Sequence, residues 1–250
     1  MELYKELVKL DEETHQYLDN NGQKYMGFSS FSDNFLIKPF NSLGASYGVA
    51  KSSGTSVDVV MDKWAQQREA GVRIDKALEV YFKTKQIEEA NNDIVDLVRS
   101  VADEYKDYHS IFNQKVVYNK EYLIAGSPDT FGLTSARGDG QFVMSDFKVF
   151  EKDDLHEHKG WLFEPMNHLS YTKQIKIIFQ LSYYAFQLEK LLNKRCKQLF
   201  IHLINPTTQT HQRIVVPYMK NDVILLLNTH KEKIKELLTV GSPMNISELI

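Results

Sequence analysis

Residues 124–149, IAGSPDTFGLTSARGDGQFVMSDFKV, decide the fold class of this chain. Two apolar and aromatic runs, TFGL and QFVMSDFKVF, flank the glycine-rich sequence SARGDG, which favours a reversing loop between antiparallel strands. Asp146 and Lys148 are two residues apart on the second strand, so their side chains leave the same face of the sheet. If the hairpin is symmetric about Arg137–Gly138, Asp129 lies directly opposite Asp146. The pattern therefore predicts two carboxylates and an ammonium on one small patch of sheet.

Opposed carboxylates on a sheet destabilise it unless a cation lies between them. Mg²⁺ suits such a gap, because it typically takes one or two carboxylates, several waters and phosphate oxygens. A bound ion of this kind lowers the pKa of a water and offsets charge on a phosphate. Lys148 would position that water or stabilise the charge of the transition state. On these residues alone, a metal site and a solvated salt-bridge cluster both remain open.

The elements around this segment predict a mixed α/β sandwich, because helices come first, then a sheet, then a helix that leads into further strands. The N-terminal half should hold a β-hairpin that turns at Asn20-Asn21-Gly22, and then helices between about 42 and 108. Among these helices we expect a capping box at Thr55 and Asp58 and an interruption at Gly71. The rest of the chain should hold a meander of antiparallel strands over 115–149, a polar loop over 151–171, a helix over about 172–193, the strands QLFIHLI and RIVVPY, and a helix over about 221–238.

Composition limits the function classes. The chain has 250 residues, 42% hydrophobic and 25% charged, which is ordinary for a globular protein. It lacks a run of ~18 apolar residues and a signal-peptide core, so we expect a cytoplasmic protein without membrane contact. The single cysteine, Cys196, excludes an internal disulfide and a four-thiolate metal site. With a formal charge of -3, DNA binding would depend on a local basic patch and on bound cations.

Three ordered motifs resemble one known family. AGSPD, SDFK and FQLSYY resemble the G-x-x-D, D-x-K and Q-x-x-x-Y motifs of the RecB-like branch of the PD-(D/E)XK nucleases. AGVRIDKALEVYF resembles that branch's G-x-x-x-H-x-x-x-E helix. The opening LDEETHQYLDNNGQKYMGFSSFSDNF, the closing VPYMKNDV and the terminal helix resemble phage-encoded exonucleases. The resemblance covers most of the chain.

The resemblance implies a restriction-endonuclease-like α/β core, in which helices flank a central mixed sheet. It implies one nuclease domain over 1–250, with an N-terminal hairpin and helical part over 1–110 and a catalytic core over 111–250. Asp129, Asp146 and Lys148 would be the catalytic residues. Asp129, Asp146 and the Phe147 carbonyl would hold Mg²⁺ or Mn²⁺.

Further site residues follow from the same resemblance. Asp75 stands where the family has a metal-binding histidine; a carboxylate suits a hard ion, and a helix-surface role is the alternative. Gln180 and Tyr184 are four apart on one helical face and would support the site and the DNA. The family often has a glutamate on the strand before G-x-x-D. Gln114 stands near that place, and Glu121 is out of register.

The function implied is a metal-dependent DNA exonuclease of recombination, repair or phage genome processing, acting in the host cytoplasm if it is phage-encoded. Partners would be DNA, further copies of the chain, or a recombination or replication protein. Lys173, Lys176 and Lys194 would line a groove that captures a DNA end. The alternatives are an endonuclease, a nuclease subunit of a helicase or CRISPR-adaptation complex, a catalytically silent DNA-binding module, and an interaction protein without a nucleic-acid role. No Walker A motif is present to support a helicase.

Overall fold

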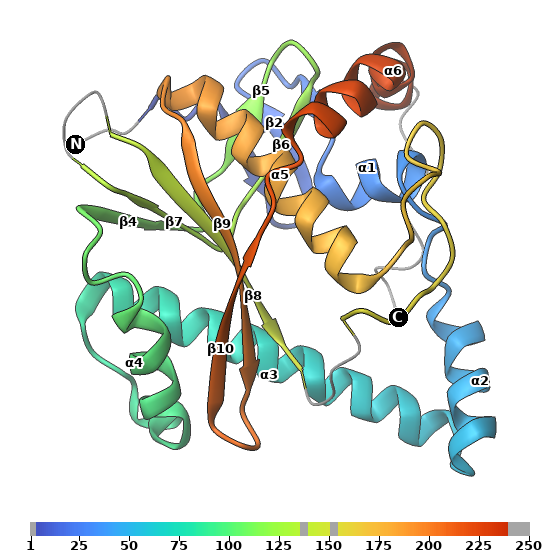
Figure 1. Ribbon diagram of the computed structural model, residues 1–250, viewed down its shortest axis with the longest axis vertical. Helices are drawn as coiled ribbons and strands as arrows, with labels where there is room; N and C mark the ends of the chain where they lie inside the picture. Colours follow the sequence, from blue (N-terminus) through green and yellow to red (C-terminus); the bar gives the residue numbers. More distant parts are fainter. Residues whose placement is uncertain (1–3, 136–139, 151–154, 240–250) are drawn as a thin grey trace.

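A five-stranded mixed sheet runs through the centre of the protein in the order β10-β9-β8-β7-β4 (Figure 1). The computed structural model describes residues 4–135, 140–150 and 155–239. Within the sheet only the β8–β9 pair is parallel. The predicted α/β class with a mixed sheet is confirmed. The strands of this sheet are β4 (Ser110–Asn113), β7 (Thr130–Leu133), β8 (Phe142–Val149), β9 (Cys196–Asn205) and β10 (Thr210–Val216).

The register of β7 and β8 is the predicted one. Thr130 pairs with Ser145, so the next residues outward, Asp129 and Asp146, oppose each other. The expected centre of the turn, Arg137–Gly138, lies outside the described residues.

Helices cover both faces of the sheet because the strands are apolar on both sides. Helix α5 (Lys173–Leu192) packs on the face that carries Phe142 and Met144. On the other face, α3 (Val57–Thr84) and α4 (Val95–Asp103) enclose Phe147 and Ile204. In Figure 1 the two layers lie above and below the strands. The end of β8 therefore lies between helices from distant parts of the sequence.

Helix α3 corrects two expectations. It continues through Gly71, although glycine costs roughly 1 kcal/mol in a helix. The buried side chains of Ile74 and Leu78 in the next turn offset that cost by packing against α4 and the sheet. The N-cap is Ser56 and not Thr55: the Ser56 hydroxyl accepts a hydrogen bond from Val59 N at 3.3 Å.

The strands before β8 do not form one continuous meander. β4 pairs with β7, and the two strands between them, β5 (Val117–Asn119) and β6 (Ile124–Gly126), pair with each other outside the central sheet; Ile124 of β6 also bridges Met26. The connection between β5 and β6 is fastened to the C-terminal helix. The remaining elements are β1 (Val8–Asp11), β2 (Gln16–Asp19) and β3 (Lys24–Tyr25), with the predicted hairpin between β2 and β3, then α1 (Phe28–Phe35), α2 (Ser42–Ser53), a 3-10 turn (Glu89–Ile94) and α6 (Lys220–Thr239).

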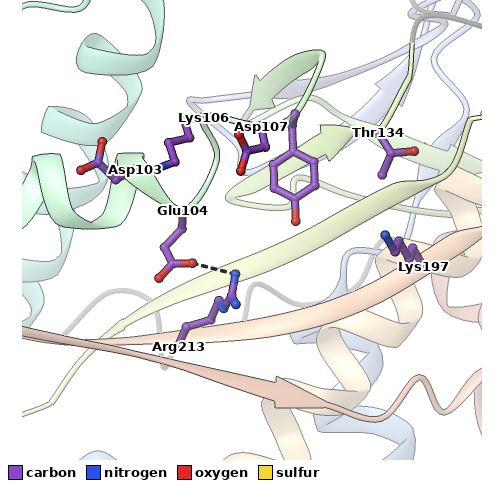
Figure 2. Close-up of a pocket in the computed structure, with 8 residues that line it drawn as sticks. Asp103, Glu104, Lys106, Asp107, Thr134, Lys197 and Arg213 are labelled. Carbon is purple, nitrogen blue, oxygen red and sulfur yellow. Dashed lines mark ion pairs between the residues drawn. The ribbon is translucent and has the colours of Figure 1, made fainter.

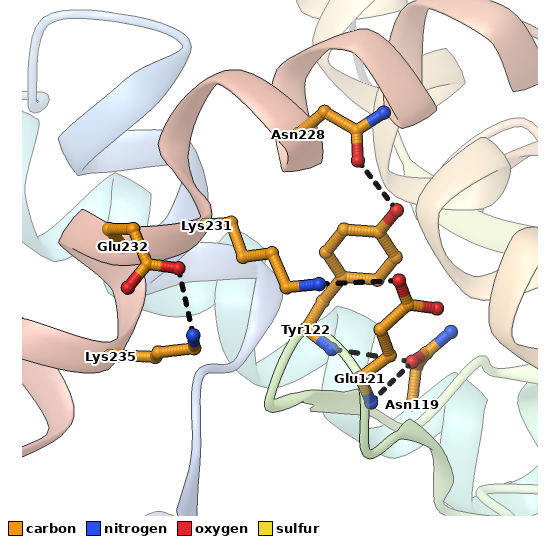
Figure 3. Close-up of polar contacts among 7 residues, drawn as sticks. All are labelled: Asn119, Glu121, Tyr122, Asn228, Lys231, Glu232 and Lys235. Atoms are coloured by element: carbon orange, nitrogen blue, oxygen red, sulfur yellow. Dashed lines mark hydrogen bonds and ion pairs between the residues drawn. The ribbon is translucent and has the colours of Figure 1, made fainter.

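Figure 3 shows the contacts that fasten the β5–β6 connection to α6. The Tyr122 hydroxyl donates to Asn228 Oδ1 at 2.7 Å. Lys231 Nζ lies 3.3 Å from Glu121 Oε1 and 5.0 Å from the centre of the Tyr122 ring. Glu121 therefore belongs to this anchor and not to the carboxylates of the β7–β8 hairpin.

The helices of the described ranges include none that is long and apolar enough to cross a membrane.

Candidate functional site

Asp146 and Lys148 meet at the end of β8. Asp146 is 2% exposed, and its Oδ2 lies 2.6 Å from Lys148 Nζ. This Oδ2 is buried, and the Lys148 ammonium is its ion-pair partner among the described residues. Lys148 Nζ also donates to the Phe147 carbonyl at 3.3 Å. A positive charge thus lies between two of the oxygens that were predicted to hold a metal.

Backbone and side-chain donors fix the orientation of Asp129. Its Oδ2 accepts from Phe147 N at 2.8 Å, and its Oδ1 accepts from Gln114 Nε2 at 3.5 Å. Gln114 N also donates to the Asp129 carbonyl at 3.2 Å. Gln114 therefore contacts Asp129 through both its backbone amide and its side chain.

The carboxyl groups of Asp75, Asp129 and Asp146 and the ammonium of Lys148 shift one another's pKa values. Burial raises the pKa of Asp75 to about 8, with Asp129 and Asp146 adding to the shift and Lys148 opposing it. Burial raises the pKa of Asp146 to about 7, against the effect of Lys148 and with that of Asp129. Burial lowers the pKa of Lys148, but Asp146 and Asp129 outweigh it and raise the pKa above its usual range. Such an arrangement favours binding of a proton or a cation.

The three carboxylates interact without meeting at one point. Among the residues that the structure describes, no three Asp, Glu, His or Cys side chains form a group that could hold a metal ion. Mg²⁺ needs only one or two carboxylates when waters and substrate phosphates complete its shell. Asp129 and Asp146, with the Phe147 carbonyl, fit that requirement, and the Lys148 ammonium 2.6 Å from Asp146 Oδ2 shows that this oxygen already stabilises a positive charge.

Gln180 and Tyr184 lie on α5 near these carboxylates. Gln180 Nε2 donates to the Tyr184 hydroxyl at 3.4 Å. Burial raises the pKa of Tyr184, and Tyr17, Asp129 and Asp146 contribute to the shift. The predicted pair is therefore brought to the site.

The glycine of AGSPD has a steric role. A Cβ on Gly126 would overlap the Tyr184 ring, which is 7% exposed. Only glycine lets the β6 backbone approach that ring so closely.

Two contacts to the site had no local sequence signal. Tyr17, from the N-terminal hairpin, is hydrogen-bonded to Ser127 within AGSPD; burial raises its pKa, and Ser127 lowers it. Burial lowers the pKa of Lys176, Asp33 of α1 raises it, and Lys148 lowers it. Lys176, which was expected only in a DNA groove, thus lies close enough to Lys148 for their charges to interact.

A buried chain of polar side chains contacts β8 on the face opposite to Asp146 and Lys148. The Tyr105 hydroxyl contacts the Ser145 hydroxyl and lies 3.0 Å from His202 Nε2. His202 Nδ1 lies 2.7 Å from His211 Nε2. Burial lowers the pKa of His202 to about 3, so its imidazole is neutral at physiological pH. The strand that carries Asp146 is thereby tied to β9 and to the segment after α4.

A hollow of about 630 Å³ lies away from Asp129, Asp146 and Lys148 (Figure 2). Arg213 of β10 pairs with Glu104 across it at 2.7 Å. Three acidic and three basic side chains line the hollow: Asp103, Glu104 and Asp107, and Lys106, Lys197 and Arg213. Because these charges balance, the hollow attracts neither anions nor cations strongly.

No family model matches this chain, and no curated protein matches it. Among solved structures, the protein SSO0001 matches with a TM-score of 0.30 and 16% identity over 57% of this chain. The match spans 58% of the length of that protein. A similarity of this size carries no argument about fold or function.

Proposed function

We propose that this protein is a Mg²⁺- or Mn²⁺-dependent deoxyribonuclease with a PD-(D/E)XK core. The observation that carries the proposal is the opposition of Asp129 and Asp146 beside Lys148, whose Nζ lies 2.6 Å from the buried Asp146 Oδ2. The motif order along the chain and the proximity of Gln180 and Tyr184 support it further.

In this proposal each residue has a separate task. Asp129, Asp146 and the Phe147 carbonyl would hold the ion, and Asp75 would add a carboxylate beside them. The ion would lower the pKa of a bound water and offset charge on the phosphate. Gln114 and the Phe147 amide keep Asp129 oriented.

The cations would act on the substrate. Lys148 would donate a hydrogen bond to the attacking water or to a phosphate oxygen. Lys176, whose charge interacts with those of Asp33 and Lys148, would contact a neighbouring phosphate. Because the net charge is -3, binding would be concentrated at such local lysines, which favours capture of a DNA end over loose binding along a duplex.

The test compares end-labelled linear DNA with the same DNA as a covalently closed circle, in Mg²⁺ and in EDTA. Wild type should shorten the linear DNA from its ends only in Mg²⁺. Asp146→Asn and Lys148→Met should abolish cutting, and Asp222→Asn, a half-buried residue in the first turn of α6, should not. Rapid Lys148-dependent linearisation of the circle would instead establish an endonuclease.

Metal binding provides a readout that does not require cutting. Titration with Mn²⁺ should give a binding isotherm that Asp129→Asn or Asp146→Asn weakens strongly. DNA binding without metal binding or cutting would favour the silent DNA-binding module. Hydrolysis that persists in EDTA would refute the proposal.

A further inference from the structure

A hollow of about 400 Å³ opens on the sheet beside Lys148. Lys148 pairs with Leu203 of β9, and Leu203 pairs with Gln212 of β10. Residues paired across neighbouring strands share a face, so these three form one row, with strands about 4.8 Å apart. Phe150, two residues beyond Lys148, lies on the same face. Leu203, Gln212 and Phe150 all line the hollow, which therefore begins one strand away from the catalytic lysine.

The hollow combines apolar surface with polar side chains, among them Gln212, Asn205 and Thr210 and the imidazoles of His156 and His211. Leu203, Ile214 and the Phe150 ring form its apolar part. The exposed Gln212 side chain makes no hydrogen bond within the described part of the chain. Asn205 also lines it, but its Oδ1 already accepts from Thr207 N at 3.0 Å and Thr208 N at 3.1 Å.

These features match the chemistry of a nucleobase, which has an apolar face and a hydrogen-bonding edge. The volume falls at the lower end of the roughly 300–1,000 Å³ typical of small-ligand sites. Positive charge lies on two sides: Lys148 on β8, and Lys173, whose Nζ lies 5.6 Å from the centre of the Phe150 ring. A base in the hollow would thus have its phosphates near both lysines.

We infer that this hollow is a nucleotide subsite that takes the base next to the scissile phosphate. The inference rests on the proposed nuclease function and adds a specific contact to it. The base packs against Phe150 and Leu203, and the Gln212 amide hydrogen-bonds its edge. Binding there aligns the neighbouring phosphate with Lys148.

The first experiment measures binding, with Ca²⁺ in place of Mg²⁺. Duplex DNA carrying 2-aminopurine at one of its last positions should change fluorescence at one position only. Gln212→Leu and Phe150→Leu should remove that change. Gln141→Leu, an exposed glutamine seven residues before Lys148, should retain it. Circular dichroism melts establish that each variant is folded.

The second experiment places an abasic site at the same position and measures cleavage in Mg²⁺. Loss of the base should lower kcat/KM of wild type about tenfold. The Gln212→Leu and Phe150→Leu variants should cut intact and abasic DNA at nearly equal rates.

The outcomes separate the subsite from the nuclease. A fluorescence change that requires Gln212 and Phe150 without any hydrolysis would support the subsite and refute the nuclease. Hydrolysis that is equal for intact and abasic DNA at every position would refute the subsite and leave the nuclease standing. Base discrimination that both variants retain would also overturn the subsite, and absence of binding and cutting in wild type would overturn both.

Discussion

Gly126→Ala should destabilise the protein by about 1–3 kcal/mol through contact with the Tyr184 ring, because a new methyl group in a packed core displaces its neighbours. The added Cβ would overlap Cε1 of Tyr184 and lie 2.8 Å from Cδ1 and 3.0 Å from Cζ. The ring cannot swing into solvent, since it is 7% exposed and packs against Phe28 with ring centres 6.2 Å apart. The ring or the β6 backbone must therefore move.

Urea unfolding measures this cost, and a double-mutant cycle assigns it. Tyr184→Ala lowers stability by itself, but it removes the atoms that the new Cβ would meet. In that background Gly126→Ala should cost almost nothing. Gly48→Ala is the matched control: its Cβ meets nothing within 4 Å in α2, so it should stabilise by up to about 1 kcal/mol. An equal loss from Gly126→Ala with and without the Tyr184 ring would refute the steric reasoning.

Three further predictions concern a cap, a thiol and a lysine. Ser56→Ala should lower the unfolding free energy by about 1 kcal/mol in urea titrations, whereas a similar loss from Thr55→Ala would contradict the assigned cap. Burial raises the pKa of Cys196 to about 12, so mass spectrometry at pH 8 should show alkylation at least about a hundredfold slower in folded than in unfolded protein; equal rates would refute that burial. Lys176→Gln should reduce the slope of log affinity against log salt for duplex DNA by about 0.9, unlike Lys190→Gln at the exposed end of α5; an unchanged slope would remove Lys176 from the DNA contacts.

Short-range features of the fold were predictable. The opposition of Asp129 and Asp146 followed from the lengths of two antiparallel strands and the loop between them, because pairing in a hairpin fixes each partner by its distance from the turn. Helix α5 was predictable from the residues at its two ends. Thr172 caps its start by accepting from Ile175 N at 3.1 Å, and Asn193 ends it in the left-handed conformation with φ 52°.

The errors arose where packing outweighed local preference. Gly71 has a poor helix propensity, yet α3 continues because its buried side chains have partners on α4 and the sheet. The strands β5, β6 and β7 matched a meander locally, and β4, which precedes residue 115, was not expected as a strand. They separate into two sheets because β4 pairs with β7 across the β5–β6 hairpin, a choice that the sequence of either strand does not encode.

The sequence by itself determined the α/β class, the β7–β8 register and the shared face of Asp146 and Lys148, because these depend on periodicity and turn length over a few tens of residues. Tertiary structure alone decided that Tyr17 of the N-terminal hairpin and Lys176 of α5 lie near that patch. The physical reason is that such contacts depend on which apolar faces bury one another. The free energy gained by burying those apolar faces depends little on which polar side chains the same helices and strands carry.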